Sequence, residues 1–253
     1  MMRLYCPHLP GGPAQPGLAD RGPVSVEILA EEFGYAKNVL RARTGDGVLL
    51  FDGKGRQARG VIAGILPDRL VVLIVEIAGS MKESTLSILL LPAILKGQKM
   101  DFVIQKAVEL GVARIKPLIT GRTEVGETRK LDRWRKISME AARQCGRCLV
   151  PPVDGPETFR RYFEAGPPPS GADGGIIFWE GGGAGLKALS ERLRGAKRIA
   201  VAVGPEGGFS AEEAGLAAEK GFYVATLGPR ILRAETAAIL SVGLVQFLFG
   251  DMG

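Results

Sequence analysis

A chain of 253 residues is long enough to bury a sizeable core, in one large domain or in two modest ones. Hydrophobic residues make up 46% and charged residues 24% of the sequence, which excludes a disordered chain. The net charge of +6 permits anionic partners such as nucleic acid, whereas the single histidine, His8, excludes sites built on several histidines.

Three further features of the sequence bear on its location in the cell. The start of the chain lacks the basic stretch and following apolar stretch of a secretory signal. The most apolar window, Leu86 to Leu95, is shorter than the roughly 20 residues that span a bilayer. Three cysteines cannot all pair, which fits a reducing compartment. We therefore expect a cytoplasmic protein with no membrane partner.

The first part of the chain has the pattern of a small β domain. A helix is predicted between residues 28 and 42. Runs rich in β-branched residues predict strands at Val48–Asp52, Ala58–Ile65 and Leu70–Ile77, separated by the turn sequences DGKG and LPDR. Close strands with tight turns favour a small barrel or sandwich of about 75 residues.

After Ser80 the pattern changes to strands that alternate with helices. The continuous apolar run LSILLLPA is typical of a strand buried on both faces of a sheet. Further strands are predicted at 114–119, 176–180, 198–203 and 223–227, helices at 98–110, 131–145, 186–193, 211–220 and 236–249, and a loop at 164–175. Such alternation predicts an α/β domain around a parallel sheet. We therefore expect two domains, residues 1–78 and residues 79–253.

A glycine-rich loop, GPEGGFS at Gly204–Ser210, follows one of the predicted strands. In α/β sheets, ligands bind at the carboxyl ends of strands, where loops and helix starts present backbone amides. Gly207 and Gly208 permit torsions and close approaches that other residues forbid. Ser210 and Glu213 predict a capping box for the next helix. No Gly-Lys-Ser/Thr follows, so the loop is not a Walker motif. A ligand loop and a plain glycine-rich turn both fit this pattern.

A second loop, LGPRILRAETA, runs from Leu227 to Ala237 after the last predicted strand. Its Leu and Ile side chains could wall an adenine pocket, and Arg233 could face an anionic substrate. Equally, Glu235 suits a helix start because of the helix dipole, and Arg233 suits an exposed surface. The pattern alone leaves both interpretations open.

Two other motifs look like cofactor sites but carry mismatches. Gly183–Ala188 fits G-x-G-x-x-G/A, yet a dinucleotide fingerprint usually opens its domain, and the acidic residue expected about 20 positions on would be Glu206, in a loop. Cys145 and Cys148 form a C-x-x-C pair, but zinc needs two more ligands, and redox pairs begin helices whereas this pair ends one. A flexible loop and core packing are the better interpretations.

Basic residues follow helical spacing on one face of the predicted helix 131–145 and its flanks. They could track a phosphate backbone, or form a solvated helix face interrupted by Glu140. The candidates for RNA binding are Arg122, Arg129, Arg133, Lys136, Arg143 and Arg147.

Taken together, these segments resemble the ribosomal RNA uridine-N3 methyltransferases of the RsmE family, within the knotted SPOUT superfamily. The similarity covers nearly the whole chain, including VLRARTGDGVLLFDGKG, LKGQKMDFVIQKAVELGVARIKPL and RWRKISMEAARQCGRCLVPPV. Its most specific parts are VGPEGGFSAEE and LGPRILRAETA. The resemblance implies an N-terminal PUA-like β-barrel that helps to hold RNA, a C-terminal SPOUT α/β domain with a deep trefoil knot, and a homodimer.

The resemblance also implies an activity and a site. S-adenosylmethionine (SAM) would donate a methyl group to N3 of a uridine in small-subunit (16S) ribosomal RNA, free or in the assembled subunit, with no metal. Arg233 would stabilise the uracil anion, and Glu235, Glu206 or water would take its proton. The residues implied for SAM binding are Glu180, Gly204, Pro205, Glu206, Gly207, Leu227, Gly228, Ile231, Leu232, Arg233 and Thr236.

A few positions depart from the family pattern. Ala234 stands where relatives commonly carry Thr, which removes a hydroxyl near the proposed centre. Arg143 stands where they commonly carry Glu, which adds positive charge to the helix. Tyr35 and Lys37 occupy a region where a histidine is often found. These differences put any role of a side-chain hydroxyl at position 234 in doubt.

Two other functions compete with a methyltransferase. A non-catalytic RNA-binding module would bind RNA without binding SAM. A nicotinamide-dependent oxidoreductase would bind that cofactor through Gly183 and Gly185. Titration with SAM and with NADH separates the three.

Overall fold

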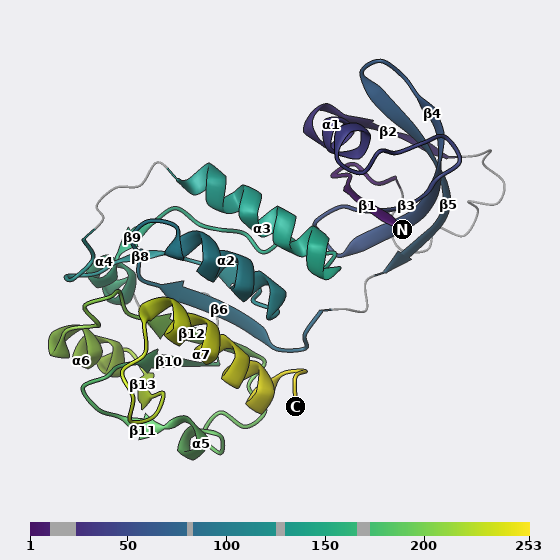
Figure 1. Cartoon of the computed structure of the whole chain (residues 1–253). Helices are drawn as coiled ribbons and strands as arrows, with labels where there is room; N and C mark the ends of the chain where they lie inside the picture. Colours follow the sequence, from purple (N-terminus) through teal and green to yellow (C-terminus); the bar gives the residue numbers. More distant parts are fainter. Residues whose placement is uncertain (11–23, 80–82, 125–129, 166–172) are drawn as a thin grey trace. The chain divides into compact units, whose positions relative to one another are not determined.

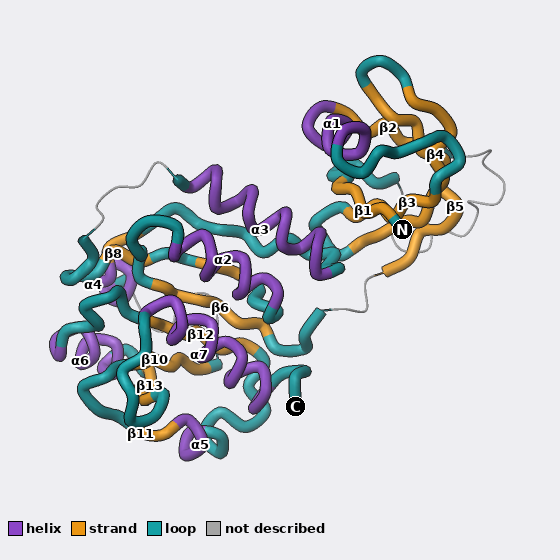
Figure 2. Tube along the Cα trace, viewed as in Figure 1, coloured by secondary structure: helices purple, strands orange, loops and turns teal. Residues whose placement is uncertain are grey.

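The computed structural model describes residues 1–10, 24–79, 83–124, 130–165 and 173–253, and the chain divides into two compact units (Figure 1). Unit 1 comprises Met1–Glu83 together with Ala142–Val150, and unit 2 comprises Ser84–Ala141 together with Pro151–Gly253. Figure 2 distinguishes their helices, strands and loops. Within the described ranges, no helix combines the length and the apolar character needed to cross a membrane.

A five-stranded sheet forms the body of unit 1. Its order is β1-β3-β4-β5-β2, and neighbouring strands are antiparallel except for β1 and β3. The elements are β1 (Met2–Tyr5), β2 (Ser25–Leu29), α1 (Ala30–Asn38), β3 (Gly47–Phe51), β4 (Arg56–Ile65) and β5 (Arg69–Gly79). Side chains alternate across a strand, and Leu4, Leu50, Ile62 and Leu70 are buried together in one core cluster. The three predicted strands and the predicted helix are confirmed, whereas β1 and β2 were not predicted.

A segment from the middle of the chain belongs to unit 1. Residues 142–150 contain the last turn of α3 (Leu131–Cys145) and the stretch that follows it. Leu149 forms a bridge with Gly53, and the N–H of Val150 donates to the carbonyl of Gly53 at 3.0 Å. Unit 1 thus includes a segment that the strand pattern of the first part of the chain does not reveal.

A six-stranded parallel sheet forms the centre of unit 2. Its order is β11-β13-β10-β12-β6-β7, and every neighbouring pair is parallel. The strands are β6 (Ser87–Pro92), β7 (Arg114–Ile115), β10 (Gly174–Phe178), β11 (Ala184–Gly185), β12 (Arg198–Val203) and β13 (Phe222–Thr226). All of β10, and all of β12 except Arg198, is buried, as in strands covered on both faces. The predicted parallel α/β sheet is confirmed.

Helices flank this parallel sheet. Besides α3 they are α2 (Lys99–Glu109), α4 (Phe159–Glu164), α5 (Leu186–Leu189), α6 (Ala211–Glu219) and α7 (Ala234–Phe249). Helix α7 packs against α2 and lies over β12 and β6, whereas α6 packs against α4 and β13 (Figure 1). The predicted capping box of Ser210 and Glu213 is present at the start of α6. Helix α5 ends at Leu189, one turn earlier than predicted, and α4 was not predicted.

The prediction of one strand over residues 114–119 is wrong. Arg114–Ile115 (β7) joins the main sheet beside β6, whereas Leu118–Ile119 (β8) pairs with β9 (Glu157–Thr158) in a separate small sheet. Pro117 lies between the two pieces and has no N–H to donate to a ladder. The apolar run is therefore divided between two sheets.

Three neighbouring parallel strands of unit 2 end at the same edge of the sheet. Strand β10 lies between β12 and β13, with Phe178 in register with Val203 on one side and with Ala225 on the other. The loops that follow these strands therefore leave the sheet side by side, although they are far apart in the sequence. This edge is where ligands bind in α/β sheets.

Candidate functional site

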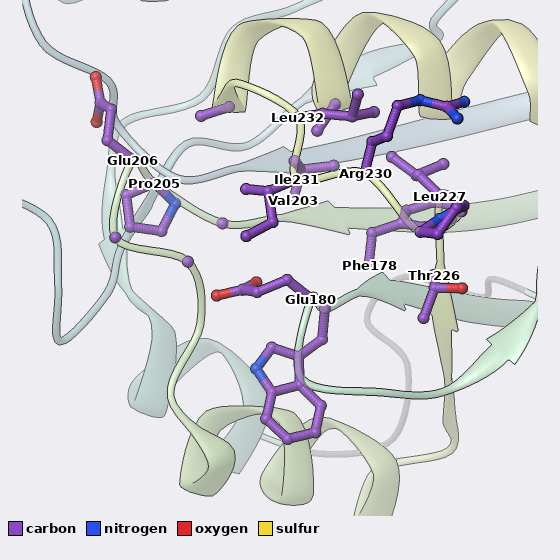
Figure 3. Close-up of a pocket in the computed structure, with 18 residues that line it drawn as sticks. Phe178, Glu180, Val203, Pro205, Glu206, Thr226, Leu227, Arg230, Ile231 and Leu232 are labelled. Atoms are coloured by element: carbon purple, nitrogen blue, oxygen red, sulfur yellow. The ribbon is translucent and has the colours of Figure 1, made fainter.

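The loops after β10, β12 and β13 enclose a pocket of ≈ 350 Å³ (Figure 3). That volume falls in the range of small-molecule sites. The ends of β10 and β12 and the first turn of α7 complete its walls. The lining residues are Phe178, Trp179, Glu180, Val203, Gly204, Pro205, Glu206, Gly207, Gly208, Thr226, Leu227, Gly228, Pro229, Arg230, Ile231, Leu232, Ala234 and Ala237.

The glycine-rich loop after β12 forms one wall and is closely folded. The N–H of Gly208 donates to the carbonyl of Pro205 at 2.9 Å, which closes a tight turn. Gly208 has a φ of +68°, which favours glycine, and a Cβ there would collide with the carboxylate of Glu180. A Cβ on Gly204 would lie 3.0 Å from the backbone carbonyl carbon of Gly208. The loop therefore brings bare backbone to the pocket, which a side chain at either glycine would block.

The loop after β10 supplies the acidic group of the pocket. Glu180 extends into the pocket toward the glycine-rich loop, whereas the carboxylate of Glu206 points away from it (Figure 3). The indole N–H of Trp179 donates to the carbonyl of Phe209 at 3.1 Å and joins the two loops. Glu180 thus places a negative charge in the pocket, an arrangement suited to a ligand that carries a positive charge.

The loop after β13 supplies an apolar wall. Leu227 and Leu232 are half-buried, and Ile231 lines the pocket although its side chain is 89% exposed. Such an apolar side chain offers surface that a ligand can cover. Arg230 lies in the same loop and also lines the pocket. Arg230 was not predicted as a site residue, although it stands within the GPRILR motif.

Three of the residues expected in the site lie just outside the lining. Arg233 occupies the N-cap position of α7 and is exposed, and Glu235 and Thr236 follow in the first turn. Ala234 and Ala237 of the same turn do line the pocket. Because residues three apart share one face of a helix, the side chains between them point elsewhere. The first turn of α7 thus carries its charged groups beside the pocket rather than within it.

Charged residues connect the rim of the pocket to the start of α2. The Lys99 ammonium lies 3.0 Å from Glu206 Oε1 and 3.7 Å from Glu235 Oε2, and the N–H of Lys96 also donates to Glu206, at 3.2 Å. Burial alone would raise the pKa of Glu206, but the hydrogen bonds from Lys99 and from the backbone lower that pKa overall. The hydrogen bond to Glu206 raises the pKa of Lys99. These two shifts favour the ionised forms of Lys99 and Glu206.

Comparison with known proteins assigns the family. Residues 82–246 match the family described as RNA methyltransferase domain, and residues 28–76 match the RNA methyltransferase PUA domain. A ribosomal RNA small subunit methyltransferase E from Synechocystis sp. is 33% identical over 227 residues, which cover 88% of this chain and 73% of the relative. The chain belongs to the ribosomal RNA small subunit methyltransferase E family. The family predicted from the sequence motifs is confirmed.

Solved structures similar to this methyltransferase E family member extend over the whole chain. A ribosomal RNA small subunit methyltransferase E from Neisseria gonorrhoeae, bound to S-adenosyl methionine, matches with a TM-score of 0.87 and 32% identity over 100% of both chains. A Legionella pneumophila structure with bound cofactor SAM matches with a TM-score of 0.85 and 32% identity, covering 99% of this chain and 98% of that one. The expected combination of a PUA domain and an α/β methyltransferase domain is confirmed.

Basic residues of this methyltransferase E family member fall into two groups, and the first is exposed in unit 2. The Arg122 guanidinium donates to the carbonyl of Gly207 at 2.8 Å, on the outer side of the glycine-rich loop. Arg133 pairs with Asp101 at 2.8 Å while its side chain stays 60% exposed, and Lys136 is exposed on the same helix. Arg129 lies outside the described residues. Arg122 and Arg133 thus combine local contacts with exposure to solvent.

The second group, Arg143 and Arg147, does not extend this exposed face. Arg143 pairs with Glu32 at 3.0 Å, and Arg147 pairs with Glu83 at 2.8 Å. The side chains of these arginines are only 10% and 6% exposed. The single basic face expected along α3 is therefore interrupted, because its C-terminal arginines are held in unit 1 by carboxylates that lie far away in the sequence.

The two mismatched motifs have structural roles. Ala184–Gly185 forms β11, an edge strand beside β13, and a Cβ on Gly183 would lie 2.7 Å from the carbonyl oxygen of Val224. The glycines of this stretch therefore pack against a strand instead of opening a phosphate loop. Cys148 is buried, with its Sγ 3.2 Å from Gln57 Oε1, and both Cys145 and Cys148 are free thiols. Among the described residues, no three His, Cys, Asp or Glu side chains gather as metal ligands.

Proposed function

We propose that this member of the methyltransferase E family uses SAM to methylate N3 of one uridine in small-subunit ribosomal RNA. The pocket at the shared edge of β10, β12 and β13 carries this proposal. It is the kind of edge where α/β sheets bind ligands, and it is formed by the two motifs that resemble the family most closely. Two similar solved structures, from Neisseria gonorrhoeae and Legionella pneumophila, contain SAM.

The residues of the pocket fit SAM. When bound, SAM supplies an activated methyl group on a positively charged sulfonium. Leu227, Ile231 and Leu232 offer an apolar wall for adenine, and the glycine-rich loop lets backbone approach the ligand closely. The Glu180 carboxylate supplies a negative charge for a cationic ligand. We assign SAM binding to these residues together with Gly204, Pro205, Glu206, Gly207 and Gly228. Arg233 and Thr236, which the resemblance also implies for SAM binding, lie just outside the lining, and we assign Arg233 to the reaction instead.

Residues beside the pocket supply the proton chemistry in this proposal. Uracil N3 carries a proton at neutral pH and is a poor nucleophile until that proton leaves. Arg233 stays charged, so it stabilises the anion on the uracil carbonyl oxygens and does not accept the proton. Glu206 is a weak acceptor, because Lys99 and the backbone lower its pKa. In the described part of the chain Oε2 of Glu235 accepts no hydrogen bond, which makes Glu235 the better candidate for the base.

We propose that unit 2 is a SPOUT domain with a deep trefoil knot. The path of the chain supports this proposal. Strand β13 lies on the far side of β10, yet the chain then returns past the pocket so that α7 packs on β12, β6 and α2. The return segment, residues 227–233, is the second loop of the pocket. Threading at this point would hold both ligand loops in place.

We propose that two copies of the chain form a homodimer through α7. Leu240 and Phe247 lie seven residues apart on one face of α7, and they are 39% and 59% exposed. Phe102 on the neighbouring helix α2 is 47% exposed. Exposed apolar side chains on two helices that pack together are typical of a protein interface. A second copy of the same face would cover it in a two-fold arrangement.

We assign RNA binding to residues 1–78, as a PUA-like barrel, and to basic side chains of the methyltransferase domain, residues 79–253. Arg122, Arg133 and Lys136 are exposed and suit contacts with phosphates. Arg129 stays a prediction, and Arg143 and Arg147 are better explained by their ion pairs within unit 1. A uridine in helical RNA would have to leave its stack to reach the pocket. We propose that the protein acts on ribosomal RNA in the cytoplasm.

The variant Arg233→Ala tests the assignment. We expect nearly normal SAM affinity by isothermal titration, and a loss of methyl transfer of about 10²- to 10³-fold, because a cation that stabilises the developing anion is removed. The substrate is small-subunit RNA from cells that lack the activity. The methylated positions are mapped after the reaction. Arg160→Ala is the control, since Arg160 is 79% exposed and lies on α4. Normal turnover in Arg233→Ala would exclude Arg233, and a wild-type chain that binds RNA but not SAM would refute the proposed function.

A further inference from the structure

Lys99 contacts two of the chain segments that form the pocket but does not line the pocket itself. It is the first residue of α2 and lies in the LKGQKMD segment. Its ammonium pairs with Glu206 in the glycine-rich loop and with Glu235 in the first turn of α7. These two carboxylates belong to segments 29 positions apart in the sequence, so Lys99 joins parts of the site that the local chain does not connect.

On the side of the glycine-rich loop, Glu206 is an anchor. Its Oε1 accepts hydrogen bonds from the Lys99 ammonium at 3.0 Å and from the N–H of Lys96 at 3.2 Å. Its carboxylate points away from Glu180 and from the centre of the pocket (Figure 3). The backbone of Pro205 and Gly207 on either side forms the wall. The Glu206 side chain thus fixes the loop from outside.

On the side of α7, Glu235 needs the charge of Lys99. Its side chain is only 16% exposed, and its Oε2 is buried without a hydrogen bond among the described residues. The Lys99 ammonium, 3.7 Å away, is the cation that offsets this carboxylate. A carboxylate withdrawn from water without such compensation is costly. The negative charge of Glu235 in the first turn of α7 is therefore compensated by Lys99 of α2.

The position of Lys99 is unfavourable for its own helix. A cation in the first turn meets the positive end of the helix dipole, where an acidic residue is preferred. The two carboxylates offset that cost. Lys99 therefore serves the contact between segments rather than the stability of α2.

We infer that Lys99 is a positioning residue that holds the glycine-rich loop and the start of α7 at the separation needed for the bound methyl donor. This inference rests on the proposed function. Lys99 does not touch the pocket, so its effect is exerted through Glu206 and Glu235. Loss of the ammonium frees two walls of the pocket at once, so affinity for the methyl donor and turnover both fall.

The test compares Lys99→Met, Lys99→Arg and Lys106→Met. We expect Lys99→Met to weaken SAM binding about five- to tenfold by isothermal titration, the size expected from loss of two partly exposed ion pairs. Lys99→Arg keeps the charge and should recover most of the affinity. Lys106 is the matched control, because it lies on the same helix with a side chain of similar exposure, 33% against 37%, and pairs with Glu109 within α2. Lys106→Met should bind SAM as the wild type does.

A double-mutant cycle separates positioning from simple destabilisation. If Lys99 acts through Glu206, Lys99→Met in a Glu206→Gln background should cost less affinity than it does in the wild type. Equal costs in the two backgrounds, wild-type affinity in Lys99→Met, or no recovery in Lys99→Arg would each overturn the inference. Thermal melting identifies a variant that fails to fold, and Glu206→Gln alone then still tests the contact. Absence of SAM binding by the wild-type chain would refute the proposed function instead.

Discussion

Gly208 is limited to glycine by two independent constraints, its left-handed torsion and the carboxylate of Glu180 beside it. We expect Gly208→Ala to weaken SAM binding about ten- to a hundredfold, because it combines backbone strain with displacement of an acidic group from the pocket. Isothermal titration measures the effect. Gly215→Ala is the control, since Gly215 lies within α6 with open space around it and an alanine there favours the helix. Equal affinities in the two variants would contradict this account of the loop.

Asp52 illustrates how one buried charge sets a pH dependence. Burial alone would raise its pKa, but hydrogen bonds from Arg56 and from the Lys54 N–H lower that pKa below its usual range. A depressed folded-state pKa contributes stability that is fully present above the unfolded value and is lost as the pH falls through the folded value. We expect Asp52→Asn to cost about 1–2 kcal/mol at neutral pH. Urea titrations from pH 6 downward should show a smaller acid loss of stability in the variant, and parallel curves would contradict the expectation.

At single positions, sequence motifs predicted the backbone of the site better than its side chains. The glycine-rich loop and the apolar residues Leu227, Ile231 and Leu232 are brought together at the pocket. Arg230 was not predicted to line it, and Arg233 was expected there but lies at the N-cap. Both arginines stand in the same short motif. Which of them faces the pocket depends on where α7 begins, and helix starts are poorly fixed by sequence.

The sequence predicts long helices and strands better than short ones. Strand β12 and helix α3 were predicted to the residue, because an apolar run or a helical period extends over many positions. The two-residue strands β8 and β9 pair across 39 positions of sequence and carry no such pattern. The basic residues at the end of α3 were expected to be exposed. Instead, Arg143 and Arg147 are largely buried in ion pairs with carboxylates far away in the sequence. Local sequence patterns cannot predict which residues far apart in the chain pair with each other.

The C-terminal end of α3 is held in unit 1 by a compact cluster. The Arg143 guanidinium pairs with Glu32 and lies 4.0 Å from the centre of the Tyr35 ring. The Arg143 cation over the Tyr35 ring adds a cation–π contact to the ion pair. We expect Arg143→Met to lower the unfolding free energy by about 2–3 kcal/mol, because Glu32 keeps a largely buried charge without this partner.

Urea denaturation measures this loss when unfolding is monitored by a probe on the sheet of unit 1. Arg135→Met is the matched control on the same helix, since Arg135 pairs with Asp132, whose side chain is 97% exposed. That variant should change stability by less than about 0.5 kcal/mol. Similar losses in the two variants would show that the charge on α3, and not the cluster, is responsible.

For the whole molecule, the proposed homodimer predicts a specific change of mass. We expect Phe247→Glu to yield a monomer by light scattering, because it places a charge among the exposed apolar side chains of α7. Val75→Glu is the control: Val75 is 72% exposed, on β5 of unit 1, and its replacement should leave the mass unchanged. A Phe247→Glu variant that keeps the wild-type mass would place the interface elsewhere.

The assignment of residues 142–150 to unit 1 has a consequence for synthesis of the protein. Domains generally fold in order as they leave the ribosome, N-terminal part first. Here the first unit lacks one of its segments until residue 150 has emerged, long after Glu83. A nascent chain arrested before that point has all five strands of the sheet but lacks the contacts that Leu149 and Val150 make with Gly53. Unit 1 is therefore incomplete until the segment that carries α2 and most of α3 has also emerged. The two units cannot be produced separately by a single cut in the chain, because residues 142–150 of unit 1 lie between the two parts of unit 2.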